Sequence, residues 1–167
     1  MSNEYNSNPI KYIIGIFIFI SMIVFFGTGC KNSENKELYH KFTDKIWGRY
    51  NILSFEIPVK NVDKFYNVYL FARFSPEFKY EKLNFNMVMN TSAGEERINE
   101  YTMDVKSKSG AFPGDYGNDS CQKTILLTKE LKLTKPGILK LEIENLTPRL
   151  ITEGISGIGI RIVQSGK

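Results

Sequence analysis

The sequence predicts an all-β protein, a single antiparallel β-sandwich domain that follows a short N-terminal export segment. Three observations support this prediction. Apolar residues alternate with polar ones over several short stretches, which is typical of strands with one buried face. Clusters of Gly, Pro, Asn and Ser separate these stretches and favour turns. The polar face of each stretch argues against an all-parallel sheet, whose strands are buried on both sides.

The alternation is clearest in six stretches, and a seventh is ambiguous. Residues 121–133 contain three consecutive apolar residues and fit either a buried strand or a short helix, of which we favour the strand. About seven or eight strands with one apolar face each close most naturally as a β-sandwich. The six clear stretches are Leu53–Ile57, Tyr66–Phe74, Leu83–Met89, Tyr101–Val105, Leu139–Ile143 and Ile158–Ile162.

The N-terminal segment has the pattern of a lipoprotein signal. An apolar stretch, Ile13–Phe26, ends at Gly27-Thr28-Gly29-Cys30. The stretch is shorter than the roughly 20 residues of a spanning helix and has the length of a signal-peptide core, about 7–15 residues. Small residues before Cys30 and polar residues after it predict that Cys30 becomes the acylated first residue of the mature chain. An uncleaved signal anchor is the alternative.

These features divide the chain into three parts. Residues 1–29 are predicted to form the signal peptide, residues 30–45 a lipidated tether with a short helix at most, and residues 46–167 the β-sandwich domain. The tether is expected because the segment after Cys30 is polar and has few apolar residues. A domain of this size can bury a core without disulfides.

Charge and cysteine usage exclude some classes of function. The net charge is +4, but the basic residues are scattered among acidic ones, so no nucleic-acid-binding patch is expected. Such a surface is compatible with anionic lipid. Because Cys30 is assigned to lipid, Cys121 is left alone and no internal disulfide is expected. We expect Cys121 to be a buried small apolar residue rather than a reactive thiol.

Residues for catalysis or for a cofactor are scarce, so no enzyme activity, cofactor or metal is expected. His40 is the only histidine, and it falls in the predicted tether, where a catalytic triad would lack rigid support. Asp115, Asn118 and Asp119 offer oxygen ligands, but their spacing is not that of a calcium loop, and turn structure is the favoured interpretation. Gly157 and Gly159 are expected to let a neighbouring segment approach the last strand, or to mark a bulge.

Two surfaces are candidates for interactions. Phe65, Tyr69, Phe71 and Arg73 share one face of a predicted strand. If this aromatic stripe is exposed, it could stack on sugars or form a protein interface. The alternative is that the segment around Trp47 covers the stripe. The second candidate is the long Gly- and Pro-rich loop of residues 107–120, because loops of this length are often functional. Its centre is Gly114, Asp115, Tyr116 and Gly117.

Several short motifs resemble those of the gliding-motility lipoprotein GldH family of Bacteroidetes-type bacteria. A signal ending at Cys30 is followed by Trp47 ahead of the first predicted strand, and the Gly114–Gly117 loop is similar to the family's Gly-Asp loop. The chain departs from the family pattern at Phe74, at Phe78-Lys79-Tyr80 and at Phe112. The remaining matching stretches are Tyr66–Arg73, Tyr80–Phe85, Gly137, Asn145–Leu150 and Ile155–Ile162.

The resemblance implies a membrane-anchored lipoprotein of the cell envelope with no known catalysis. Such a protein would bind membrane lipid through acylated Cys30. Its protein partners would be other envelope proteins, namely those of gliding motility and type IX secretion. The resemblance leaves open which membrane and leaflet receive the protein. The alternative from a different class is a glycan- or ligand-binding β-sandwich module on the envelope.

Overall fold

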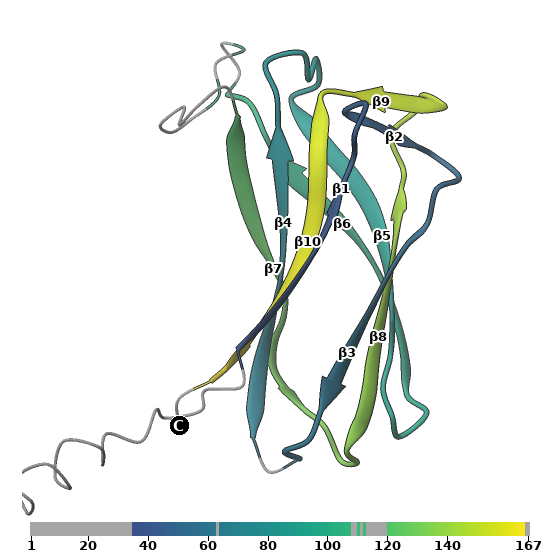
Figure 1. Ribbon diagram of the computed structural model, residues 1–167, viewed down its shortest axis with the longest axis vertical. Coiled ribbons are helices and arrows are strands. Elements are labelled where there is room, and N and C mark those ends of the chain that lie inside the picture. Colours follow the sequence, from purple (N-terminus) through teal and green to yellow (C-terminus); the bar gives the residue numbers. More distant parts are fainter. Residues whose placement is uncertain (1–34, 63, 108–109, 111, 113–119, 166–167) are drawn as a thin grey trace, which may run out of the picture. The chain divides into compact units, whose positions relative to one another are not determined.

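The chain forms two four-stranded antiparallel sheets that face each other, with a small two-stranded sheet across one end (Figure 1). This computed structural model describes residues 35–62, 64–107, 110, 112 and 120–165. All of them belong to the compact unit Ser33–Lys167. The predicted all-β antiparallel sandwich is confirmed.

Each sheet is assembled from strands that are distant in sequence. The first sheet has the order β1 (Lys36–Lys41), β10 (Ile155–Gln164), β4 (Phe65–Phe74) and β7 (Cys121–Lys132). The second has the order β3 (Leu53–Val59), β8 (Gly137–Asn145), β5 (Lys82–Asn90) and β6 (Glu96–Asp104). The small sheet pairs β2 (Ile46–Gly48) with β9 (Ile151–Glu153).

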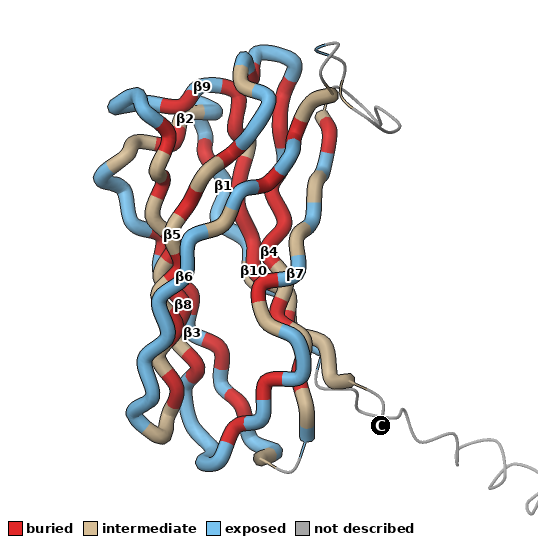
Figure 2. Tube along the Cα trace, turned by 180° about the vertical axis from the view of Figure 1, so that it is seen from behind, coloured by how far each residue is buried: buried red, intermediate tan, exposed pale blue. Residues whose placement is uncertain are grey.

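The core lies between the two large sheets and is built by the alternation seen in the sequence. Buried and more exposed residues alternate along β3 and β5, and Figure 2 shows the same alternation along the tube. In β4 every second residue from Tyr66 to Phe74 is buried. Because side chains of a strand point to opposite faces in turn, one face of each sheet supplies apolar groups and the other faces outward.

The two sheets are also joined at their edges by side chains. On one side the Lys36 ammonium donates a hydrogen bond to the carbonyl oxygen of Pro58. On the other side the hydroxyl of Tyr101 donates to the carbonyl oxygen of Leu127 at 2.7 Å. Burial raises the pKa of the Tyr101 phenol. The hydroxyl therefore stays protonated and can donate this hydrogen bond between the two sheets.

Ten strands are present where about seven or eight were expected. Residues 121–133, interpreted as a strand, do form β7. The strands that were not expected are β1, β2 and β9. Because β2 and β9 have three residues each, they are too short for an alternating pattern to be visible.

Part of the predicted tether, residues 30–45, is a strand in the structure. Lys36–Lys41 forms β1, an edge strand that pairs with β10 from Lys36 opposite Ile162 to Lys41 opposite Gly157. An edge strand is held largely by backbone hydrogen bonds to one neighbour, so it needs few apolar residues. Most residues of β1 are exposed, which is why its composition was that of a tether.

The chain enters the sandwich at the end opposite β2 and β9 (Figure 1). At the entry end the side-chain oxygen of Asn35 accepts a hydrogen bond from the backbone N–H of Gln164 at 3.2 Å. The other end of β1 leads directly toward β2. In the part of the chain that the structure describes, no helix has the length and apolarity that a membrane crossing needs.

Two glycines of β10 allow the close approach that the sequence predicted. A side chain at Gly157 would overlap the Tyr39 hydroxyl, and one at Gly159 would overlap the Phe71 ring and lie 2.7 Å from the Leu38 carbonyl oxygen. The register of β10 on β4 also shifts between Ile155 and Gly157. The glycines therefore leave room for Tyr39 to lie across β10.

We predict that Gly159→Ala lowers the free energy of unfolding by about 2–3 kcal/mol, because the new methyl group overpacks the site. The matched control is Gly48→Ala. A Cβ at Gly48 would be 3.9 Å from its nearest neighbouring atom, the Asn51 Cβ, so the effect on the free energy of unfolding should stay within about 0.5 kcal/mol. Urea unfolding of both variants measures the difference. Equal effects would contradict the role given to Gly159.

Candidate functional site

The predicted aromatic stripe lies on the outer face of β4, but one of its rings is covered. Phe71 is fully buried, because Tyr39 of β1 stacks on it with ring centroids 5.8 Å apart and an interplanar angle of 7°. The Arg161 guanidinium lies 5.4 Å from the centroid of the same ring. Phe71 is therefore covered by Tyr39 of β1. The sequence had suggested cover by the segment around Trp47 instead.

The cations on this face are engaged with the protein's own side chains. The Arg73 guanidinium lies 4.9 Å from the Tyr39 ring centroid, and its Nε donates a hydrogen bond to Gln122 at 3.0 Å. Arg161 forms an ion pair with Glu37 of β1 at 2.6 Å. These contacts hold β1 on the sheet. A sugar-binding platform here would lack its central ring, while Phe65, Tyr69 and Arg73 stay a predicted interaction surface.

Other predicted site residues are placed differently or fall outside the structure. Cys30 and the loop residues Gly114, Asp115, Tyr116 and Gly117 lie outside the described residues. Cys121 is buried, as expected. Within the described ranges, no group of three or more His, Cys, Asp or Glu side chains is arranged to hold a metal ion.

A different site emerges at the end of the sandwich opposite the chain entry. We call it the cap: residues 45–52, which include β2, together with β9, the turn of residues 75–80 and the loop of residues 146–150. The carbonyl oxygen of Lys45 accepts hydrogen bonds from the backbone N–H groups of Gly154 at 2.9 Å and Ile155 at 3.1 Å, and the Ser75 N–H donates to Gly154 at 2.9 Å. Gly154 has φ = 85°, and a Cβ there would overlap the Phe78 backbone. Only glycine fits this crossing.

Inside the cap, three buried side chains form a closed ring of hydrogen bonds. Asn145 Nδ2 donates to the Thr152 hydroxyl at 2.9 Å, and the Thr147 hydroxyl donates to Asn145 Oδ1 at 2.8 Å. The two threonine hydroxyls are also in contact. Since Thr147 gives its one hydroxyl proton to Asn145, Thr152 must donate to Thr147.

The same asparagine also binds two backbone groups. Its Nδ2 donates to the carbonyl oxygen of Trp47 at 3.1 Å, and its Oδ1 accepts from the Thr147 N–H at 2.9 Å. Asn145 thus uses both donors and accepts two hydrogen bonds. This one side chain connects the end of β8 with β2, with β9 and with the loop between β8 and β9.

Trp47 is a core residue of the cap. It is fully buried, its ring lies 6.1 Å from that of Phe42, and its Nε1 donates to the carbonyl oxygen of Asn51 at 2.8 Å. The indole therefore has both an apolar surrounding and a partner for its N–H, as buried tryptophans require.

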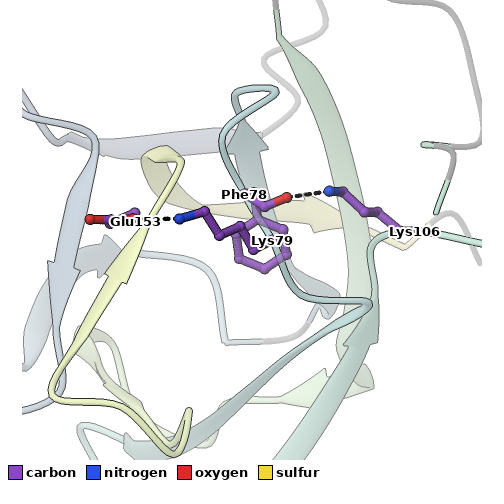
Figure 3. Close-up of polar contacts among 4 residues, drawn as sticks. All are labelled: Phe78, Lys79, Lys106 and Glu153. Atoms are coloured by element: carbon purple, nitrogen blue, oxygen red, sulfur yellow. Dashed lines mark hydrogen bonds and ion pairs between the residues drawn. The ribbon is translucent and has the colours of Figure 1, made fainter.

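Two ion pairs and a hydrogen bond connect the turn of residues 75–80 to its surroundings. Lys79 pairs with Glu153 of β9 at 3.4 Å, and the Lys106 ammonium donates to the carbonyl oxygen of Phe78 (Figure 3). Glu77 lies 3.5 Å from the Lys45 ammonium. The pKa of the Glu77 carboxyl is lowered, first by the Ser75 hydroxyl and next by its own backbone N–H, with a smaller effect from Lys45.

A surface pocket of about 250 Å³ opens between β9 and this turn, and it is lined by Lys79, Tyr80, Arg149, Ile151 and Glu153. Its lysine and glutamate are already paired with each other. Such a pocket is suited to hold a side chain of another molecule. Sequence reasoning did not select these residues as a site, although Asn145–Leu150 was among the family-like stretches.

We predict that Asn145→Leu lowers the free energy of unfolding by at least about 3 kcal/mol, because several buried polar groups lose their partners at once. Asn84→Leu is the control, since Asn84 is only half-buried and accepts a hydrogen bond from Thr102 at an exposed position. Water can replace that bond, so a cost below about 1 kcal/mol is expected. Thermal unfolding followed by tryptophan fluorescence measures both; similar losses would contradict the ring's importance.

Comparisons with solved structures give weak likenesses. A family GH115 4-O-methyl-α-glucuronidase, BtGH115A, is 13% identical with a TM-score of 0.44, over 83% of this chain and 18% of that chain. Latent PorU from Porphyromonas gingivalis is 9% identical with a TM-score of 0.35, over 82% of this chain and 14% of that chain. This chain thus spans under a fifth of the length of either protein.

A search among curated proteins finds no match. Residues 34–162, most of the chain and nearly the whole sandwich, match the model of the GldH lipoprotein family. The motifs that resembled this family in the sequence lie mainly on β4, β8, β10 and the cap. The chain belongs to the GldH lipoprotein family.

Proposed function

We propose that this protein is a lipid-anchored component of the cell envelope that acts without catalysis, by holding other proteins of a gliding-motility or type IX secretion assembly. The observation that carries the proposal is the GldH lipoprotein match over residues 34–162. The match begins just after Cys30, the residue that directly follows the predicted signal peptide.

The geometry of the cap supports a binding role. Its buried polar side chains hold loops in place through bonds to one another, and the lysine and glutamate of its pocket form an exposed ion pair. A rigid domain that presents loops at one end is a common way to build a binding surface. The domain thereby resembles a scaffold for contacts with a partner.

Anchoring is proposed to depend on Cys30. Two or three acyl chains hold a protein firmly on a membrane, whereas a single chain gives only marginal binding. The envelope is therefore the proposed location, with membrane lipid as the first partner and envelope proteins as the second.

We predict that Cys30→Ser moves the full-length protein from the membrane fraction to the soluble fraction and abolishes incorporation of a labelled fatty acid. Ser33→Ala, a change in the same polar segment, is the control and should behave like the unchanged chain. A Cys30→Ser protein that stays membrane-bound with unchanged electrophoretic mobility would contradict lipid anchoring.

The scaffold role predicts co-purification of defined partners. When the tagged, lipidated protein is isolated from detergent-solubilised envelopes, mass spectrometry should identify gliding or type IX secretion components. Recovery of the protein alone, or together with polysaccharide, would argue against the scaffold role and for the glycan-binding alternative.

A further inference from the structure

Exposed apolar side chains gather at the cap. Four large apolar residues that are exposed in the described chain, Tyr50, Ile52, Leu150 and Ile151, lie in two short segments. These segments are neighbours, because Gly48 pairs with Ile151 and the Arg49 N–H donates to the carbonyl oxygen of Leu150 at 2.8 Å. Single exposed apolar residues are ordinary, but a group of them beside a pocket is typical of an interaction surface.

Two arginines make this surface positive. Arg49 is adjacent to Tyr50, and Arg149 is adjacent to Leu150 and lines the pocket. Neither the Arg49 nor the Arg149 guanidinium takes part in a salt bridge among the described residues. Lys79 and Glu153 cancel each other in one ion pair, and Lys45 and Glu77 cancel each other in another. The free charge of the cap is therefore positive, and Arg149 lies where apolar surface and pocket meet.

We propose that this cap surface, Tyr50, Leu150, Ile151 and Arg149, binds a segment of a partner protein that presents an acidic side chain beside an apolar one. The inference rests on the proposed scaffold function and names the chemistry of the partner. Arg149 would bind the carboxylate, and Leu150 and Ile151 would cover the apolar group. Tyrosine and arginine are, together with tryptophan, enriched at the energetic centre of such interfaces.

The other occupants fit less well. A small-molecule site usually has a volume of roughly 300–1,000 Å³, and this pocket is smaller, at about 250 Å³. A second copy docked symmetrically would bring like charges of the same cap together, which opposes association. A membrane surface offers no specific apolar side chain, and the described chain enters the sandwich at the opposite end (Figure 1).

Photo-crosslinking in the native bacterium tests this inference. A photoreactive amino acid is placed at Leu150 of the full-length chain, and a matched control is placed at Ile98 on β6. The two positions are comparably exposed, at 64% and 61%. We expect a protein adduct from position 150 that position 98 does not give, with the crosslinked peptide containing Asp or Glu near the attachment point.

Charge reversal then tests the role of Arg149. Arg149→Glu should reduce the adduct at least tenfold, because the acidic partner is now repelled. Changing the partner's crosslinked acidic residue to lysine should restore the adduct in this variant. The inference is overturned by an adduct with lipid alone, by an adduct with a second copy of this chain, by no adduct, or by an adduct that Arg149→Glu leaves unchanged.

Two controls separate this inference from the proposed function. Arg149 is exposed, so Arg149→Glu should keep the melting temperature of the unchanged protein, which shows that a lost adduct is not a folding defect. The variant should also stay in the membrane fraction. Loss of membrane attachment in Cys30→Ser with an unaffected adduct in Arg149→Glu would support anchoring and overturn the cap inference alone.

Discussion

The cap depends on the hydrogen-bonded ring formed by Asn145, Thr147 and Thr152. Buried polar side chains are costly unless every donor and acceptor has a partner. Here the ring closes on itself, and the remaining N–H of Asn145 reaches the Trp47 carbonyl oxygen. The three-residue strands β2 and β9 make few backbone hydrogen bonds of their own. The ring and buried Trp47 attach them to the end of β8 and so to the sandwich.

A second constraint acts on the first sheet and is set by glycine. Because Gly157 and Gly159 have no side chains, Tyr39 lies across β10 and stacks on Phe71. This contact, with Arg73 and Arg161 around it, holds an exposed edge strand that follows directly from the N-terminal segment. The described chain begins at one end of the sandwich, where Asn35 binds the backbone of Gln164, and the cap lies at the other end.

The sandwich fold could be predicted from the sequence, but the candidate functional site could be predicted only in part. Alternation identified the long strands because each has one buried face, and the paired glycines of β10 indicated a close approach. The covering of Phe71 by Tyr39 was not predictable, since the period of a strand says which residues share a face and not which distant strand lies over it. The cap was missed because β2 and β9 are short and its ring joins residues of separate segments.

Hydrogen–deuterium exchange of the full-length protein in detergent micelles tests most directly whether the cap is a rigid platform. If the ring holds the cap as part of the core, the amides of β2 and β9 should exchange as slowly as those of β8, and Asn145→Leu should speed exchange in β2 and β9 before it does so in β8. Exchange of β2 and β9 in the unchanged protein at the rate of an open loop would contradict the account.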